Sequence, residues 1–312
     1  MNAGLPTLRA LAPAKINLGL FLGPVRDSDG RHELVTVMQS ISLADELTLR
    51  AAPGGRVGDE LVCPGVPGPL EDNLAARALR RFRARTGWQA PPLLLTIEKR
   101  IPIAAGLAGG SADAAATLRL ARAASGLGDD ALLLEIAGEL GADVPAQVAP
   151  GRWLATGAGE RLERLPAPSA SFGVLVLPAP FELATGEVYA EADRLGLGRD
   201  REQLARRHEE LASAFARGAP LPAATELLHN DLQRAAVSLR GEIGEALRAL
   251  GAAGASPALL SGSGPTALGL FARPREEGLA LARLAAEALG AREPAAIAAA
   301  PVDAAFGAPL PA

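Results

Sequence analysis

The chain has only two lysines, Lys15 and Lys99, among 31 basic residues. Arginine stands at almost every basic position of this chain. A remaining lysine therefore indicates a place where a compact ammonium is needed and a planar guanidinium does not fit. Lys15 and Asn17 are two residues apart in a predicted strand and therefore share one face, while Ile16 and Leu18 point into the core. An ammonium held there can offset charge that develops on a reacting group, although an ordinary solvent-facing strand shows the same spacing.

Two further residues have acid–base character. Asp143 lies in the segment Gly141–Pro145, just after a predicted helix. A carboxylate at that place is ionised at neutral pH and can orient an alcohol and take its proton late in a reaction. His32 follows Asp29-Gly30, which predicts a tight turn. Without a chemical role, Asp143 would be a turn residue, because aspartate beside glycine and proline is common in turns. His32 would then be an exposed loop histidine.

A glycine-rich loop follows the predicted strand 93–98 and opens a helix. Its centre, Gly106-Leu-Ala-Gly-Gly-Ser111, lets the backbone approach an anion. The helix start supplies free N–H groups and about half a positive charge. The loop is neither a Walker A loop, which needs Gly-Lys-Ser/Thr, nor a Rossmann fingerprint, which needs Gly-x-Gly-x-x-Gly. It therefore predicts phosphate binding, or a glycine-rich helix start without a ligand.

A second glycine-rich segment, Gly262–Ala267, fits the pattern Gly-x-Gly-x-x-Ala. The apolar run after it predicts a strand, whereas a dinucleotide site needs a helix there. A Gly/Ser turn at this place can still close over a phosphate from the other side.

The elements that must position these residues predict an α+β fold, because strands come first and helices then mix with strands. Strands are expected at 14–22, 33–50 (one or two), 93–98, 152–156, 172–177, 256–271 (strand, turn, strand) and 294–300. Helices are expected at 72–87 with Asp72 as the N-cap, from the glycine-rich loop to 126, and at 129–140, 185–195, 201–217, 239–250 and 275–290. Residues 51–69 predict a loop or hairpin, a polar turn separates strands 152–156 and 172–177, and the tail to Ala312 is expected to be loose.

Length and composition limit the classes of protein that fit. A length of 312 residues predicts two domains or one large one. We expect two, 1–155 and 156–312, with the boundary near 150–160. The net charge of −4 argues against a nucleic-acid partner, and one cysteine excludes an internal disulfide. No apolar run is long enough to span a membrane, so we expect a cytoplasmic protein with no membrane partner.

Five segments resemble, in order and spacing, the motifs of the GHMP small-molecule kinases. They are PAKINL (13–18), DGRHEL (29–34), IPIAAGLAGGSADAAATL (101–118), GADVP (141–145) and LLSGSGPTALGLF (259–271). The first, second and fourth are specific to a subfamily whose acceptor carries a cytidine diphosphate group. The resemblance covers about residues 12–271. It implies a two-domain fold with the active site in the cleft between the domains, ATP as the phosphoryl donor and Mg²⁺ on its phosphates. The assembly expected is a monomer or a homodimer.

The resemblance also implies roles for the matching residues. Lys15 would contact the acceptor hydroxyl and neighbouring charge, and Asp143 would take the hydroxyl proton. The acceptor pocket would be lined by Asn17, Arg31, His32, Thr185 and Tyr189, with His32 on the cytidine side and the Tyr189 ring stacked on the pyrimidine. ATP would be bound near its adenosine by Asn73 and Lys99, and at its phosphates by Pro102, Ala104, Ala105, Gly106, Leu107, Ala108, Gly109, Gly110, Ser111 and Ala112. No metal-binding set of protein side chains is implied.

The sequence departs from the family pattern at three positions. Arg31 stands where the family often has tyrosine, so a guanidinium would replace a second aromatic ring. Ala108 and Ala112 replace a glycine and a serine, which leaves Ser111 as the nearest metal or phosphate partner in the loop. Three alternatives remain open: a kinase of mevalonate, homoserine or a sugar, a relative that binds nucleotide without transferring phosphate, and an α+β binding protein of unknown ligand. The DGRH segment with Tyr189 favours a cytidine-bearing acceptor.

Overall fold

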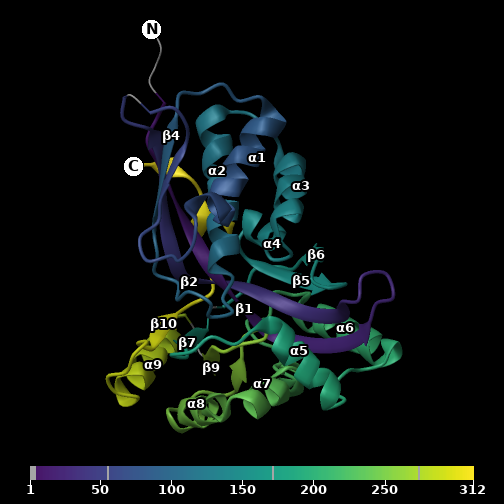
Figure 1. Ribbon diagram of the computed structural model, residues 1–312. Helices are drawn as coiled ribbons and strands as arrows, with labels where there is room; N and C mark the ends of the chain where they lie inside the picture. Colours follow the sequence, from purple (N-terminus) through teal and green to yellow (C-terminus); the bar gives the residue numbers. More distant parts are fainter. Residues whose placement is uncertain (1–4, 55, 171, 273–274) are drawn as a thin grey trace.

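A long hairpin connects the two halves of the molecule (Figure 1). The computed structural model describes residues 5–54, 56–170, 172–272 and 275–312. Strands β1 (Leu8–Val25) and β2 (His32–Ala51) pair antiparallel along almost their whole length. The turn between them contains Gly30 with φ +69°, so the expected tight turn is confirmed. Strand β1 is twice as long as the expected 14–22, whereas β2 matches the expected 33–50 and forms one strand, the first of the two alternatives.

The first sheet has seven strands built around this hairpin. Its order is β11-β1-β2-β4-β3, and β5 pairs with both β2 and β6. The added strands are β3 (Glu60–Val62), β4 (Leu93–Glu98), β5 (Arg152–Thr156), β6 (Arg161–Arg164) and β11 (Leu310–Pro311). Three of them correct the sequence predictions: β3 lies in the expected loop or hairpin, β6 in the expected polar turn and β11 in the tail expected to be loose. All three are too short for a clear hydrophobic period, and β11 exists because β1 offers it an open edge.

Four helices cover one face of the upper part of this sheet: α1 (Leu74–Thr86), α2 (Gly109–Ser125), α3 (Asp130–Leu140) and α4 (Val144–Val148). Helix α2 is rich in alanine, and Ala114, Ala115 and Ala116 are fully buried. The predicted N-cap Asp72 is wrong, because residues 70–72 form a short 3₁₀ turn and Asn73 Oδ1 accepts from Ala75 N at 2.9 Å. Helix α4 was not predicted, since five residues containing Pro145 show no helical period.

The second sheet has the order β10-β7-β9-β8 and lies in the lower half. Its strands are β7 (Gly173–Leu177), β8 (Ala258–Leu260), β9 (Ala267–Phe271) and β10 (Ile297–Ala299). One face packs on α8 (Gly241–Ala252) and α9 (Arg275–Ala288). The other packs on Ile16 and Leu18 of β1 and on α6 (Arg201–Phe215), so the middle of β1 lies between two layers. The apolar side of β1 is therefore confirmed as core.

Helices α5 (Thr185–Arg194) and α7 (Gln233–Leu239) complete this half. They pack with α8 and with Leu20 and Leu22 of β1. Helix α7 was not predicted, and α8 begins at Gly241 rather than at 239. The chain passes from the first sheet to the second between β6 and β7. The expected domain boundary after residue 155 falls inside β5, and that boundary stays a prediction. In the part of the chain that the structure describes, no helix is both long and apolar enough to cross a membrane.

Candidate active site

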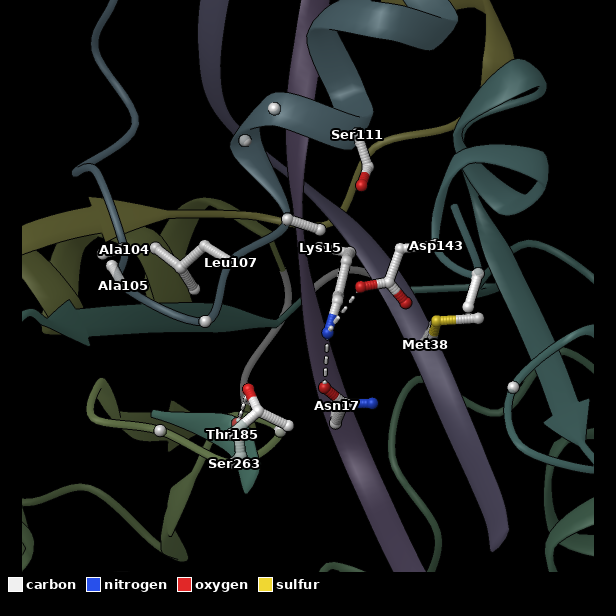
Figure 2. A pocket seen from close by; sticks show the side chains of 18 of the residues that line it. Lys15, Asn17, Met38, Ala104, Ala105, Leu107, Ser111, Asp143, Thr185 and Ser263 are labelled. Carbon is white, nitrogen blue, oxygen red and sulfur yellow. Dashed lines mark hydrogen bonds and ion pairs between the residues drawn. The ribbon is translucent and has the colours of Figure 1, made fainter. Parts of the chain in front are cut away.

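A cavity of about 650 Å³ lies where β1, the glycine-rich loop and the second half of the chain meet (Figure 2). It brings together sixteen of the nineteen predicted site residues: Lys15, Asn17, Asn73, Lys99, Pro102, Ala104, Ala105, Gly106, Leu107, Ala108, Gly109, Gly110, Ser111, Asp143, Thr185 and Tyr189. Ala112 is buried behind the loop, and Arg31 and His32 lie just outside the lining. Most of the residues that the family resemblance selects therefore line one cavity.

The Lys15 ammonium is held by a chain of buried hydrogen bonds along the hairpin. Lys15 Nζ donates to Asn17 Oδ1 at 3.0 Å, and Asn17 Nδ2 donates to Thr36 Oγ1 at 2.8 Å. Thr36 Oγ1 in turn donates to Gly19 O at 2.6 Å. Lys15 and Asn17 are 8% and 3% exposed, so the alternative of a solvent-facing strand is wrong. Thr36 was missed, and its signal is one polar side chain within the apolar run Val35–Val37.

The β1–β2 ladder is irregular where these side chains project. Its register shifts between Pro13 and Lys15 and again between Asn17 and Gly19. Such irregularities re-aim side chains and are common near active sites. They direct Lys15 and Asn17 into the cavity while Ile16 stays in the core.

Asp143 faces Lys15 from the other wall of the cavity. Lys15 Nζ and Asp143 Oδ2 are 3.8 Å apart, and the Asp143 side chain is 41% exposed. Asp143 is the residue before α4, and in the described chain its side chain makes no capping hydrogen bond to that helix. The carboxylate is thus free to accept a proton from a molecule in the cavity. Figure 2 shows Ser111, Lys15 and Asp143 grouped around the same space.

The glycine-rich loop enters the cavity as a strained turn. Ala104 and Ala108 both have φ +55°, and Gly106 has φ +71°. Ala108 is the N-cap of α2, and the first bond of that helix runs from Ala112 N to Ala108 O. The N–H groups of the three residues between them have no partner within the helix, as at any helix start. They are available to an anion in the cavity.

The second glycine-rich loop closes the cavity opposite the first. A Cβ on Gly106 would lie 2.5 Å from Gly264 O, so the two loops touch through their backbones. Ser263 Oγ lies 3.0 Å from Thr185 Oγ1 at the start of α5, and both hydroxyls line the cavity. That this Gly/Ser turn closes over a phosphate from the other side stays a prediction. Ser263 itself was not singled out, although its place in that turn was the available signal.

Lys99 is the centre of a buried ion cluster in the cavity wall. Its Nζ lies 2.5 Å from Asp45 Oδ2 and 2.7 Å from Asp113 Oδ2. Burial opposes the charge of Lys99, but the two carboxylates outweigh it and raise the Lys99 pKa. Burial, reinforced by the Asp45 charge, raises the pKa of Asp113 to about 7 despite the neighbouring lysine. Asp45 and Asp113 were missed because they are distant from Lys99 in sequence.

The predicted acceptor side contains a pair of rings. The His32 and Tyr189 ring centroids are 5.5 Å apart with their planes at 41°. His32 is 9% exposed, with Nδ1 2.9 Å from Gly23 O and Nε2 3.1 Å from Asp193 Oδ1, so the alternative of an exposed loop histidine is wrong. Burial raises the pKa of Tyr189, and the Asp143 charge adds to this, so its phenol is neutral at physiological pH.

Arg31 is exposed beside this pair. Its Nη2 donates to Ala158 O at 3.1 Å, and Ala158 lines the cavity. The guanidinium therefore lies at the rim, while the ring beside Tyr189 comes from His32. Stacking of Arg31 on a base stays a prediction.

Two family models match the chain. One describes the GHMP kinases N terminal domain and matches residues 73–151, and the other describes the GHMP kinases C terminal and matches residues 204–290. A 4-diphosphocytidyl-2-C-methyl-D-erythritol kinase of Anaeromyxobacter dehalogenans is 42% identical over 281 residues, which covers 88% of this chain and 84% of the relative. The kinase of the same name from Streptomyces coelicolor is 42% identical and covers 81% and 84%.

Solved structures agree with these matches. A crystal structure of 4-(cytidine 5'-diphospho)-2C-methyl-D-erythritol kinase superposes with a TM-score of 0.73 at 35% identity, covering 94% of this chain and 98% of the other. Homoserine kinase from Cytophaga hutchinsonii superposes with a TM-score of 0.70 at 16% identity, covering 98% and 97%. The second likeness shows the shared fold alone.

Proposed function

The chain belongs to the GHMP kinases and, within them, to the family of 4-diphosphocytidyl-2-C-methyl-D-erythritol kinases, and on this premise we propose its reaction and the residues that perform it. It transfers the γ-phosphoryl group of ATP to the 2-hydroxyl of 4-diphosphocytidyl-2-C-methyl-D-erythritol, a step of the non-mevalonate route to isoprenoid precursors. The observation that carries this proposal is the Lys15–Asp143 pair, 3.8 Å apart, in a cavity entered by two glycine-rich loops.

Asp143 acts as the base for the acceptor hydroxyl. The hydroxyl oxygen forms a bond to the γ-phosphorus while the bond from that phosphorus to the β,γ-bridging oxygen breaks and ADP leaves. The hydroxyl proton passes to Asp143 late in this transfer, since phosphoryl transfer depends more on positioning and charge than on covalent help from the protein. The exposed Asp143 oxygens fit this role.

Lys15 keeps the reacting groups in place and offsets their charge. Its ammonium faces Asp143 on one side and is fixed by Asn17 on the other. A positive charge at this place stabilises negative charge on the transferring phosphoryl oxygens. The relay through Thr36 prevents the flexible lysine stem from leaving this position.

The loop 101–112 and the start of α2 hold the ATP phosphates. The N–H groups of the first turn of α2 fit an anion, and the absence of a side chain at Gly106 lets the loop lie directly against Gly264. Among the described residues no group of three His, Cys, Asp or Glu side chains could hold a metal ion, whereas the Ser111 hydroxyl lies in the cavity. The Ser111 hydroxyl would be the protein partner of Mg²⁺ bound with ATP, and the ion would neutralise phosphate charge.

The cytidine end of the acceptor binds beside Tyr189 and His32, whose rings already lie together. Asn73 and Lys99 lie beside the adenosine of ATP. Mevalonate, homoserine or a sugar as the acceptor has no base that could stack on these two rings. The net charge of −4 supports a protein without a nucleic-acid partner. A cytoplasmic location, the lack of a membrane partner and a monomer or homodimer stay predictions.

An assay of ADP release with ATP and the cytidine-diphospho-methylerythritol acceptor tests the proposal. Mevalonate and homoserine are run beside it, and we expect turnover with the cytidine compound alone. The control variant Asp143→Asn should lower kcat by about 10²–10⁴-fold while its melting temperature stays unchanged, because a general base contributes about this much and this side chain makes few contacts. Equal turnover of the three acceptors, or full activity of Asp143→Asn, would contradict the proposal.

A further inference from the structure

Asp143 owes its position to a very short helix. Helix α4 has five residues, and in the described chain the polar contact recorded for the Asp143 side chain is the 3.8 Å pair with Lys15. A pair that long, with one member 41% exposed, does not fix the carboxylate by itself. The position of Asp143 therefore depends on what holds α4.

Gln147, four residues after Asp143, holds α4 against the hairpin. Its side chain is 1% exposed. Nε2 donates to Pro13 O at 3.0 Å, and Oε1 accepts from Ser40 Oγ at 3.4 Å. Pro13 precedes Lys15 by two residues, and Ser40 is the residue of β2 directly opposite Lys15. One amide thus connects the helix that carries Asp143 to the strand pair that carries Lys15.

The Pro13 carbonyl lies where the ladder between β1 and β2 is interrupted. Pro13 pairs with Ala44 and Lys15 pairs with Ser40, so residues 41–43 of β2 face a single residue of β1. In that stretch β2 turns to the second half of the molecule: Ser42 N donates to Ala300 O at 2.8 Å. A buried carbonyl at such a break needs a donor from elsewhere, and Gln147 supplies it.

A buried arginine continues this connection. Arg119 of α2 donates to the Gln147 carbonyl, to Leu11 O at 2.9 Å and to Gly307 O at 3.0 Å. These acceptors belong to α4, to β1 and to the tail. Since α2 begins at the glycine-rich loop, one network joins the loop helix, α4 and the strand of Lys15.

We propose that Gln147 is a positioning residue that sets the separation and orientation of Asp143 relative to Lys15. The inference rests on the proposed kinase reaction. Gln147 does not line the cavity, so it acts on catalysis through α4 rather than by touching a substrate. A shift of about 1 Å in a catalytic group can lower the rate about 10²-fold.

The variant Gln147→Leu keeps the size of the side chain and removes both hydrogen bonds. We expect kcat per folded enzyme to fall by about 10- to 100-fold. The KM values for ATP and for the acceptor should stay within about twofold of the wild type, since no binding group is lost. The matched control is Thr117→Val, which removes the buried bond from Thr117 Oγ1 to Asp113 O within α2 and should leave kcat unchanged.

A double-mutant cycle distinguishes positioning from a general loss of structure. In the Asp143→Asn background the position of residue 143 matters little, so adding Gln147→Leu should lower kcat by less than twofold further. The proposal would be overturned if Gln147→Leu lowered kcat by the same factor in the wild type and in Asp143→Asn. A Gln147→Leu enzyme with normal kcat and a lowered melting temperature would also overturn it. If Gln147→Leu does not fold, Ser40→Ala must lower kcat at unchanged KM; it removes the Ser40 bond to the Gln147 amide together with the bond from Gly151 N to Ser40 Oγ. A wild-type enzyme without turnover would instead contradict the proposed function.

Discussion

At the scale of single residues, the Lys15 ammonium lies between β1 and the second glycine-rich loop. Its Nζ lies 3.0 Å from Asn17 Oδ1 and 3.7 Å from the position that a Cβ on Gly262 would take. Lys15→Arg keeps the charge but places a planar fork between β1 and the second glycine-rich loop. We expect kcat to fall about tenfold or more in the ADP-release assay.

The reverse exchange on the surface is the control for this prediction. Arg100→Lys changes a half-exposed side chain that pairs with Glu46 and should leave kcat unchanged. Near-normal activity of Lys15→Arg would show that only the charge of residue 15 matters. The rarity of lysine in this chain would then give no evidence for a chemical role of Lys15.

The Tyr189 ring gives a second prediction at this scale, for the acceptor base. Stacking of a base on an aromatic ring contributes about 1–3 kcal/mol. Tyr189→Ala should therefore raise the acceptor KM by roughly 5- to 150-fold, because 1.4 kcal/mol corresponds to tenfold. Tyr189→Phe should have little effect, since the phenol is neutral and the ring face is kept. Neither change should alter the KM for ATP.

Tyr189 also packs against the apolar cluster beneath α5, so a structural role competes with stacking. The melting temperature and the acceptor KM are measured on the same preparation to separate the two. A large loss of thermal stability with an unchanged acceptor KM would refute the stacking assignment.

At the scale of elements, the contact between the two glycine-rich loops depends on Gly106. Its φ of +71° favours glycine, and an added Cβ would lie 2.5 Å from the Gly264 carbonyl oxygen. Gly106→Ala must strain the backbone or move the loops apart, at a cost of about 1–2 kcal/mol from the left-handed conformation alone. We expect the KM for ATP to rise about tenfold or more.

Ala108→Gly is the matched change in the same loop. Ala108 already holds φ +55°, so glycine relieves strain there without removing a contact that ATP needs. This variant should bind ATP as the wild type does in a nucleotide titration. Equal ATP affinity of Gly106→Ala would mean that the phosphates are not bound where the two loops meet.

The elements show where sequence reasoning succeeds and where it ends. The loop 101–112 and the spacing of Lys15 and Asn17 are local features, and local geometry follows from sequence. Helix α4, strand β11 and the cap of α1 by Asn73 depend on partners far along the chain or on a choice between adjacent polar residues. Short elements of this kind have no period to read.

At the scale of the whole molecule, sequence reasoning also could not identify which charged residues lie together. Lys99 stood out by its rarity, but its partners Asp45 and Asp113 come from β2 and from α2. Only the fold brings them together, because the sequence separations are 54 and 14 residues. The cluster lies between the first sheet and its helices, so its protonation bears on the stability of that half.

Stability should depend on pH through this cluster. The pKa of Asp113 is raised to about 7 by burial and by Asp45, and its Oδ1 has no hydrogen-bond partner among the described residues. A group whose folded pKa exceeds its unfolded value of 3.8 binds a proton more tightly in the folded state. Its contribution to stability is complete below pH 3.8 and is lost as pH rises through about 7.

The melting temperature of the wild type should therefore fall as pH rises from 5.5 to 8.5, with about 1 kcal/mol corresponding to roughly 2–4 °C. Asp113→Asn removes the titrating group, while Lys99 keeps its 2.5 Å pair with Asp45, so this variant should melt with a flatter pH dependence. Burial alone would raise the pKa of Asp231, but its hydrogen bonds with His229 and Arg199 outweigh burial and lower that pKa. The stability that Asp231 contributes is therefore lost as pH falls, and only at more acidic pH. Parallel melting curves of wild type and Asp113→Asn across this range would show that Asp113 stays ionised beside Lys99.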